Sequence, residues 1–189
     1  QSIIHDHHEP LSLHQAARRC SDFFLRRPGT AMNCASPAAG ELITELLQSQ
    51  VQCVLATTAS TQPCLHLMAY AFDQGLREIY FASYENTGKI NNIAQNAQVA
   101  LLWDNRTAQH RDHVEGLALT ATGHARRLTG TQHEEISRLL SLRNPTLSGL
   151  LSDRRSATFA VAVKHYRLVR GYGEIHDYIP QAQNDCTTR

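Results

Sequence analysis

Hydrophobic and polar residues follow a helical period in the first part of the chain and a strand period in the rest. Apolar side chains within residues 42–47 line one face of a helix. This spacing predicts a helix that begins at Pro37, a residue favoured in the first helical turn, with Ser36 as its cap. A further helix is predicted over residues 12–26, whereas the polar residues 1–10 indicate disorder.

In the rest of the chain, apolar residues occur in strand-length segments that turn residues separate. The predicted strands cover residues 51–58, 63–72, 78–83, 98–104, 114–128 and 156–173. Helices are predicted over residues 87–95 and 129–143. The strand at 63–72 is apolar on both faces, which is typical of a barrel wall that is covered on both sides. Short connections favour antiparallel pairing, so the pattern predicts a mainly β fold, a small closed barrel of six strands with flanking helices.

Composition narrows the class of protein further. The chain has 189 residues, of which 42% are hydrophobic, so it can bury a core of its own. A net charge of +1 predicts no nucleic-acid partner, and apolar runs of strand length predict no membrane span. The five cysteines contain no C-x-x-C pair, and the first residues do not read as a signal peptide. We therefore expect free thiols and a cytoplasmic location.

The most informative stretch joins a predicted strand to a predicted helix at Thr87, Gly88 and Lys89. Thr87 suits the N-cap position, and Lys89 then lies in the first helical turn, where the helix dipole disfavours a cation. A bound anion would explain such a lysine, because free N–H groups, a hydroxyl and an ammonium group would converge on it. A surface lysine on an ordinary capped helix is the alternative.

Taken in order, several segments resemble the FMN-binding split-barrel family, the group that includes pyridoxamine 5′-phosphate oxidase. They are Cys53-Val-Leu-Ala-Thr-Thr58, Pro63-x-x-His-Leu-Met-Ala-Tyr70, Tyr80-Phe-Ala-Ser83, Thr87-Gly-Lys89, Asn92-Ile93, Val99-Ala-Leu-Leu-Trp103, Val114-Glu-Gly116, Gly123-x-Ala125 and Val169-Arg-Gly-Tyr-Gly-Glu174. The resemblance implies an FMN-binding split-barrel domain over residues 37–180. An N-terminal extension with one helix, residues 1–36, would precede it, and a tail, residues 181–189, would follow.

The resemblance also implies a homodimer with FMN at the subunit interface. Thr87 and Lys89 would hold the phosphate group, and Arg111 falls near a position that contacts the flavin. Two strand segments would line the isoalloxazine ring. These are His66, Leu67, Met68 and Ala69, followed by Phe81, Ala82 and Ser83.

This chain departs from the oxidase at basic positions. The oxidase has an arginine where this chain has His66, a lysine at Ala71 and a second basic residue at Gly88. The arginine-rich C-terminal signature of the oxidase is also missing. Pyridoxamine phosphate oxidation is therefore not expected, and FMN should be held less firmly. The resemblance is closer to other flavin-binding relatives and to haem-handling and nitroreductase-like branches.

We expect a flavin-dependent oxidoreductase acting on an unidentified small molecule, in which the cofactor performs the chemistry and no catalytic residue is assigned. The alternative is non-enzymatic, a flavin- or haem-binding module with His165 and His176 as candidate haem ligands. A deazaflavin is a further alternative cofactor. The histidines at positions 5, 7 and 8 suit adventitious metal binding, and no resident metal is expected.

Overall fold

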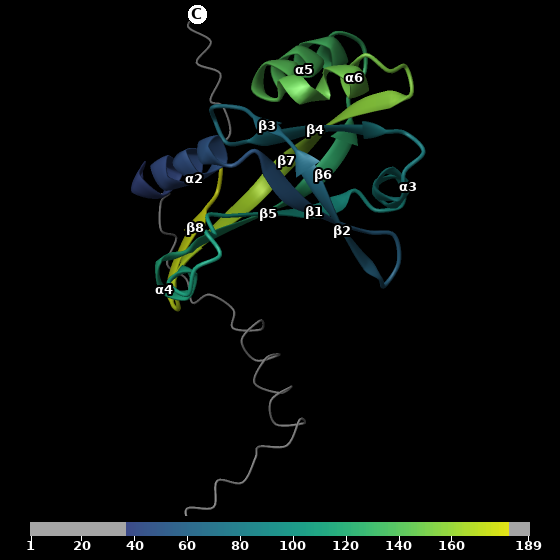
Figure 1. Ribbon diagram of the computed structural model, residues 1–189. Helices are drawn as coiled ribbons and strands as arrows, with labels where there is room; N and C mark the ends of the chain where they lie inside the picture. Colours follow the sequence, from purple (N-terminus) through teal and green to yellow (C-terminus); the bar gives the residue numbers. More distant parts are fainter. Residues whose placement is uncertain (1–36, 182–189) are drawn as a thin grey trace, which may run out of the picture. The chain divides into compact units, whose positions relative to one another are not determined.

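Eight strands form one antiparallel sheet in the computed structural model, which describes residues 37–181 (Figure 1). The strands are β1 (Gln52–Thr58), β2 (Pro63–Ala69), β3 (Ala71–Phe72), β4 (Glu78–Tyr84), β5 (Gln98–Asp104), β6 (Leu117–Arg127), β7 (Ser156–Arg170) and β8 (Glu174–Tyr178). They pair in the order β2-β1-β5-β6-β7-β4-β3, and β8 pairs with β7 beside this path. Tyr70 alone joins β2 to β3, so the chain brings the two ends of the sheet back together. The predicted mainly β, antiparallel barrel fold is confirmed.

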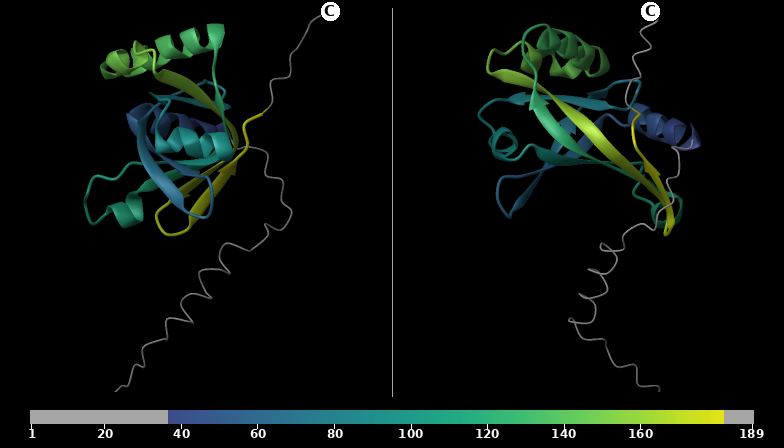
Figure 2. Two further views of the ribbon diagram at one scale, coloured as in Figure 1. Left: turned by 90° about the vertical axis from the view of Figure 1, so that its right-hand side faces the viewer. Right: turned by 180° about the vertical axis from the view of Figure 1, so that it is seen from behind.

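Helices pack against the outer face of β4 and against the main core. They are α2 (Pro37–Ser49), α3 (Gly88–Gln95), α4 (Asp112–Glu115), α5 (Gly130–Arg143), the 3₁₀ helix η1 (Pro145–Leu147) and α6 (Ser148–Leu151). Figures 1 and 2 show α5 and α6 together over the part of the sheet formed by β3, β4 and the start of β7. Within residues 37–181, no helix has the length and apolar character needed to span a bilayer.

Some of the sequence predictions fall on residues that lie outside the described part of the chain. They concern the helix over 12–26, the histidines at positions 5, 7 and 8, and Cys20, Cys34 and Cys186.

The sheet contains two more strands than the six predicted. The predicted strand at 63–72 is interrupted at Tyr70, which is fully buried. Its hydroxyl shares one proton between Leu47 O at 2.6 Å and Gln50 O at 3.0 Å. These bonds hold Tyr70 against the end of α2 and divide the strand into β2 and β3. Gly171, at φ +52°, turns the chain into β8, which the sequence pattern did not predict.

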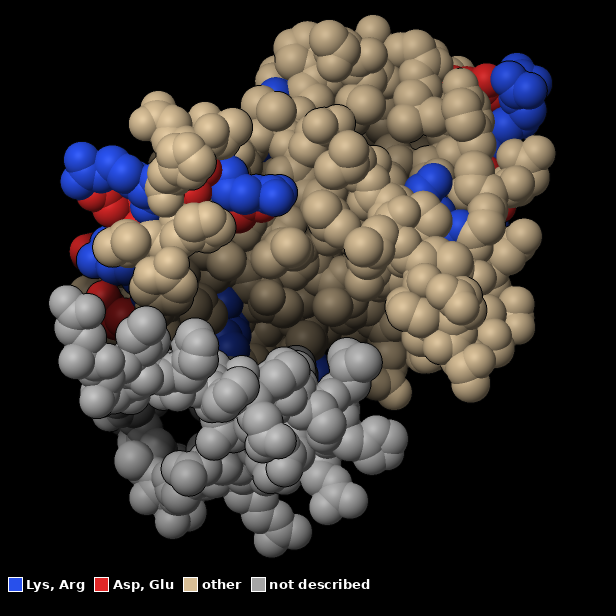
Figure 3. All heavy atoms as spheres, turned by 60° about the horizontal axis from the view of Figure 1, so that its bottom comes forward, with Lys and Arg blue, Asp and Glu red and all other residues tan. Residues whose placement is uncertain are grey.

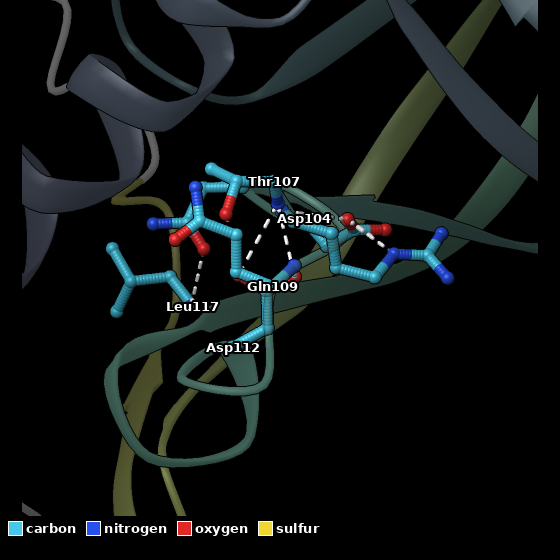
Figure 4. A network of polar contacts seen from close by, with 7 residues as sticks. Asp104, Thr107, Gln109, Asp112 and Leu117 are labelled. Carbon is cyan, nitrogen blue, oxygen red and sulfur yellow. Dashed lines mark hydrogen bonds and ion pairs between the residues drawn. The ribbon is translucent and has the colours of Figure 1, made fainter.

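An ordered loop and a short helix precede β6, which therefore begins later than predicted (Figure 4). The Asp112 carboxylate accepts hydrogen bonds from the backbone N–H of Thr107 at 3.0 Å and of Gln109 at 3.2 Å. It also accepts one from the Thr107 hydroxyl at 2.9 Å. Because one carboxylate ties these groups together, the segment that carries Arg111 has a defined conformation.

Strand β7 has two different neighbours along one of its sides. Its first half pairs with β4 and its second half with β8, while β6 accompanies it along the other side. The β6–β7 register shifts between Thr122 and Gly123, which marks a β-bulge. The sheet thus splits beside β7 into a part that carries β4 and a part that carries β8.

Two hydrophobic cores lie on opposite faces of β4. Inside the barrel, Phe81 belongs to the main core, which α2 joins through Ile43 and Leu47, both fully buried. On the outer face, Tyr80 packs in a second core with Leu140 of α5. Burial of each such aliphatic side chain stabilises the fold by about 1.5–3 kcal/mol.

The outer face of β2 is uncovered in the single chain. The sequence indicated a strand covered on both faces, but Leu65 and Leu67 are each 70% exposed. Strand β4 is covered on both sides, because α5 and α6 lie over it, whereas β2 lies at one end of the sheet path.

Candidate functional site

Inward-facing rows of side chains on β1, β2 and β4 become polar at one mouth of the barrel. Burial alternates along β1 and β2, whereas β4 is buried on both faces. The inward rows reach Thr57 on β1, His66 on β2 and Ser83 on β4. Helix α3 follows directly after β4 and contacts β1, and its Ile93 joins the main core. The polar ends of three strands therefore meet the first turns of α3.

Six residues meet at this mouth. We call them the α3 polar cluster: Thr57, His66, Ser83, Thr87, Lys89 and Asn92. Lys89 Nζ donates to Ser83 Oγ at 3.2 Å, and this oxygen lies 3.3 Å from Thr87 Oγ1. Asn92 Nδ2 donates to Thr57 Oγ1 at 3.0 Å, and His66 Nε2 lies 3.2 Å from the same oxygen. Hydrogen bonds thus connect residues of three strands and one helix.

The cluster carries a positive charge without a counter-charge. Lys89 forms no ion pair with any described residue. Burial lowers the pKa of Lys89, because its charged form loses hydration. Burial and then the Lys89 charge lower the pKa of His66, which favours its neutral form. A bound anion would offset both effects.

Thr87 occupies the N-cap position of α3, as predicted, but its hydroxyl does not cap the helix. The hydroxyl donates instead to Tyr84 O at 3.0 Å, and no described side chain caps α3. The N–H groups of Ile90 and Asn91 donate to Thr87 O, which leaves those of Gly88 and Lys89 for an anion, as at phosphate sites on other helix N-termini.

Part of the predicted cofactor site comes together in this cluster. The predicted members are His66, Ser83, Thr87 and Lys89. Thr57 and Asn92 complete the cluster, and the sequence prediction missed both. Asn92 could have been found, because it lies three residues after Lys89 on the same helix face. Thr57 gave no such signal, because its approach to α3 is a tertiary contact.

The other predicted ring-lining residues divide into buried and outward-facing ones. Met68 and Phe81 lie in the main core, and Ala82 lies in the second core. Their side chains face away from the surface, so these residues can meet a ligand only through their backbone. Leu67 is exposed and Ala69 is half-buried, and both lie on the outer face of β2.

Within the single chain, Arg111 lies away from the α3 polar cluster. It directly precedes α4, and its guanidinium forms an ion pair with Glu115 Oε1 at 2.5 Å. Figure 1 shows α4 and α3 at opposite sides of the barrel. Within one chain, Arg111 is therefore not part of the α3 polar cluster.

The candidate haem ligands are each paired with a carboxylate. His165 Nε2 lies 2.8 Å from Asp177 Oδ1, and His176 Nε2 lies 2.8 Å from Glu174 Oε1. His176 faces the buried Leu168 across the ladder, whereas His165 shares the opposite face with Asp177. The two histidines of one chain therefore cannot bind the same iron.

Comparison with known families identifies the class to which this fold and site belong. The family model described as pyridoxamine 5′-phosphate oxidase matches residues 39–169, well over half of the chain. The chain therefore belongs to the pyridoxamine 5′-phosphate oxidase family, as its motifs indicated. Among curated proteins, none matches the sequence.

Solved structures share the fold at low sequence identity. A haem-binding protein from Mycobacterium smegmatis superimposes with a TM-score of 0.68 and 16% identity, over 78% of this chain and 60% of that one. Campylobacter jejuni ChuZ gives 0.66 and 15%, over 78% of this chain and 61% of that one. HutZ, the haem storage protein of Vibrio cholerae, gives 0.57 and 14%, over 72% and 92%. The chain spans only about 60% of the length of the first two, and identities this low show a common fold and nothing finer.

Proposed function

We propose that the α3 polar cluster binds the phosphate group of FMN. The observation that carries this proposal is the partly buried Lys89 ammonium, which has a hydroxyl partner but no carboxylate among the described residues. A phosphate would accept hydrogen bonds from Lys89 Nζ, from the Ser83 hydroxyl and from the N–H groups of Gly88 and Lys89. The Thr87 hydroxyl would join them by turning away from Tyr84 O. Membership of the pyridoxamine 5′-phosphate oxidase family supports a flavin phosphate over other phosphates.

The flavin ring would then lie along β2. Within the described residues, β2 pairs with β1 alone, so the backbone groups of its other edge are available to a ligand. Such groups suit the polar edge of a flavin ring. The buried side chains of Met68 and Phe81 would support this binding surface from inside the barrel.

We further propose a homodimer that covers the outer face of β1, β2 and β5. Leu65 and Leu67 are each 70% exposed, Leu102 is 37% exposed, and Val54 lies across from both Leu67 and Leu102 in the ladder. Figure 3 shows charged side chains gathered on the side where Figure 1 places α4, with few on the broad surface beside it. A second copy would bury this apolar face. It would also offer a second Arg111, which the single chain keeps away from its own cluster.

The reaction class that follows is flavin-dependent oxidation or reduction of a small molecule. FMN supplies the hydride or electron transfer when it is bound, and the chain holds and orients it. Because His66, Ala71 and Gly88 replace basic residues of the oxidase, pyridoxamine phosphate is not the proposed substrate. Cys53 and Cys64 are free thiols, which supports a reducing, cytoplasmic location.

Lys89→Gln tests the phosphate assignment. Loss of the charged hydrogen bond should weaken FMN binding by about 1–3 kcal/mol, or roughly 5–150-fold, measured by quenching of flavin fluorescence. Arg138→Gln, which changes an exposed side chain of α5, is the control and should leave the affinity unchanged. Riboflavin lacks the phosphate and should bind the wild type and Lys89→Gln equally. Unchanged FMN affinity in Lys89→Gln would refute the assignment, and mass spectrometry of the small molecule released on denaturation identifies the cofactor.

Haem binding is the second candidate function, and the pairing of His165 with Asp177 favours it. A carboxylate on one ring nitrogen is the arrangement that orients many metal-ligating histidines through the other nitrogen. The Mycobacterium smegmatis protein of the same fold is a haem-binding protein. Haem added to the purified protein should then give a Soret band that His165→Ala removes. A band that persists in both His165→Ala and His176→Ala would exclude these ligands.

A further inference from the structure

A hollow of about 330 Å³ lies on the outer face of the sheet, where β1, β5, β6 and β7 are neighbours. Small apolar side chains line it together with Thr57, Thr58 and Gln98 from β1, β2 and β5, and polar side chains line it from β6 and β7. The lining includes Ala56, Pro63, Ala100, Thr122, His124 and Lys164. A volume of this size is at the lower end of the range for small-molecule pockets.

The β-bulge places two basic residues in succession on this outer face. Lys164 has no partner on β6, because Thr122 pairs with His165 and the next residue of β6 pairs with Val163. Val163 and Tyr166 both pack against the main core. The two residues between them, Lys164 and His165, therefore project outward, which a regular strand would not allow.

Gly123 makes this bulge possible. A Cβ atom at Gly123 would lie 2.3 Å from Ala162 O and 2.9 Å from a methyl group of Val161. The backbones of β6 and β7 approach each other more closely here than any side chain permits. The outward position of Lys164 is thus built into the sheet itself.

Lys164 carries a charge that no described carboxylate neutralises. Its Nζ lies 3.5 Å from His124 Nε2, and Lys164 takes part in no ion pair among residues 37–181. The nearby Asp177 is engaged by His165 at 2.8 Å and by Arg167 at 2.9 Å. Since an ammonium group has three donors, Lys164 can contact His124 and still donate to a ligand.

We propose that this hollow binds a small organic anion, a carboxylate or a phosphate monoester with a compact apolar body. Its charged group would accept hydrogen bonds from Lys164 Nζ and the Thr122 hydroxyl. Its body would lie on Ala56, Pro63 and Ala100.

The lining shares Thr57 with the α3 polar cluster but does not include Lys89, the charged residue of that cluster. The charged contact of this ligand is Lys164, so the site does not use the Lys89 ammonium. Ala56 and Ala100 lie on the outer face of β1 and β5 that the proposed second copy would cover, so this ligand would bind where the second copy approaches.

Titration of the full-length protein with benzoate and with phenyl phosphate, followed by backbone amide NMR, tests the proposal. We expect saturable shifts at Gly123 and Lys164, and the tighter probe identifies the charged group. Neutral benzamide should produce no such shifts. Lys164→Gln should weaken binding by at least about tenfold, while Lys164→Arg should retain it. Lys89→Gln should leave binding unchanged, which separates this site from the proposed phosphate site.

Four results would overturn the proposal. Three of them are the absence of saturable shifts with either probe, equal binding of benzamide and benzoate, and unchanged affinity in Lys164→Gln. The fourth is a set of shifts confined to α3, because these would place the anion at the α3 polar cluster. A protein that does not bind FMN but binds benzoate through Lys164 would refute the proposed function and support this site.

Discussion

Replacing Arg143 by methionine should destabilise the protein by about 2–4 kcal/mol. The Arg143 guanidinium, on α5, donates hydrogen bonds to Leu47 O and, at 3.0 Å, to Gln50 O at the end of α2. It also lies over the rings of Tyr70 and Phe72, at 5.0 and 5.1 Å from their centroids. Arg143 thus links α5 to the end of α2, next to Tyr70, the residue between β2 and β3.

The magnitude follows from the separate contacts of the guanidinium. Hydrogen bonds from a charged donor contribute about 1.5–3 kcal/mol each where the acceptor has no other partner. Here the Tyr70 hydroxyl lies within hydrogen-bond distance of both carbonyls and can still donate its one proton to one of them, so the loss lies toward the lower end of that range. The ring contacts add about 0.5–1 kcal/mol each. A cation at a helix C-terminus adds about 0.3–1 kcal/mol.

Urea unfolding followed by Trp103 fluorescence measures the effect. Trp103 is the single tryptophan, is buried, and lies 5.4 Å from the Tyr70 ring, so its emission reports on this region. Arg138→Met is the matched control on the same helix, because its side chain is 77% exposed, and it should change the free energy of unfolding by less than about 0.5 kcal/mol. If Arg143→Met is no more destabilising than this control, the reasoning is refuted. Tyr70→Phe should cost more in the Arg143→Met background than alone, because both donors to the same carbonyls are then lost.

Three other properties can be tested with equally small changes. Gly123→Ala should destabilise the protein by about 1–3 kcal/mol, because the new methyl group would collide with β7. Gly149→Ala, which has open space around it, is the control and should not. Equal denaturation midpoints for the two variants would contradict the close approach of β6 and β7 at the bulge. Burial raises the pKa of Cys53 to about 12, so iodoacetamide at mildly alkaline pH should alkylate Cys64 first, and peptide mass spectrometry that finds the reverse order would show that Cys53 is accessible. Desolvation alone would raise the pKa of Asp112, but side-chain and backbone hydrogen bonds from its loop hold it below the ordinary value of 3.8. The ionised Asp112 carboxylate therefore stabilises the folded protein above pH 3.8, and this stabilisation is lost as the pH falls through the folded-state pKa. Asp112→Asn should make the free energy of unfolding depend less on pH in this range. An identical pH profile would be evidence against the hydrogen bonds assigned to this loop.

Most elements could be predicted because their signals are continuous in the sequence. The helix that begins at Pro37, the strand at 98–104 and the helix that ends at Arg143 lie where the patterns placed them. The break at Tyr70 was not predictable, because the carbonyls of α2 that hold its hydroxyl come from a distant part of the chain. Strand β8 gave no clear alternation, because it contains exposed and half-buried residues but none that is fully buried.

The candidate site likewise contains some residues that a local sequence pattern reveals and others that only tertiary packing brings together. Thr87 and Lys89 could be found because a helix start is a local pattern, and the structure adds that Lys89 lacks a carboxylate partner among the described residues. Thr57 could not be found, because only the packing of α3 against β1 brings it to the cluster. Met68 and Phe81 lie on strands, as the resemblance implied. Their burial in the main core could not be predicted, because it depends on side chains that other strands of the barrel supply.

The position of β7 in the chain constrains how the protein can fold during synthesis. β7 is the last long strand to leave the ribosome, yet it supplies hydrogen-bond partners to β4, β6 and β8. Until Ser156–Arg170 has emerged, β4 and β6 each have an unpaired edge that can join wrong partners. Pairings between strands so distant in sequence also form slowly. The β1–β2 and β5–β6 pairs can form earlier, but we expect the two parts of the sheet to join only when the whole of β7 is available.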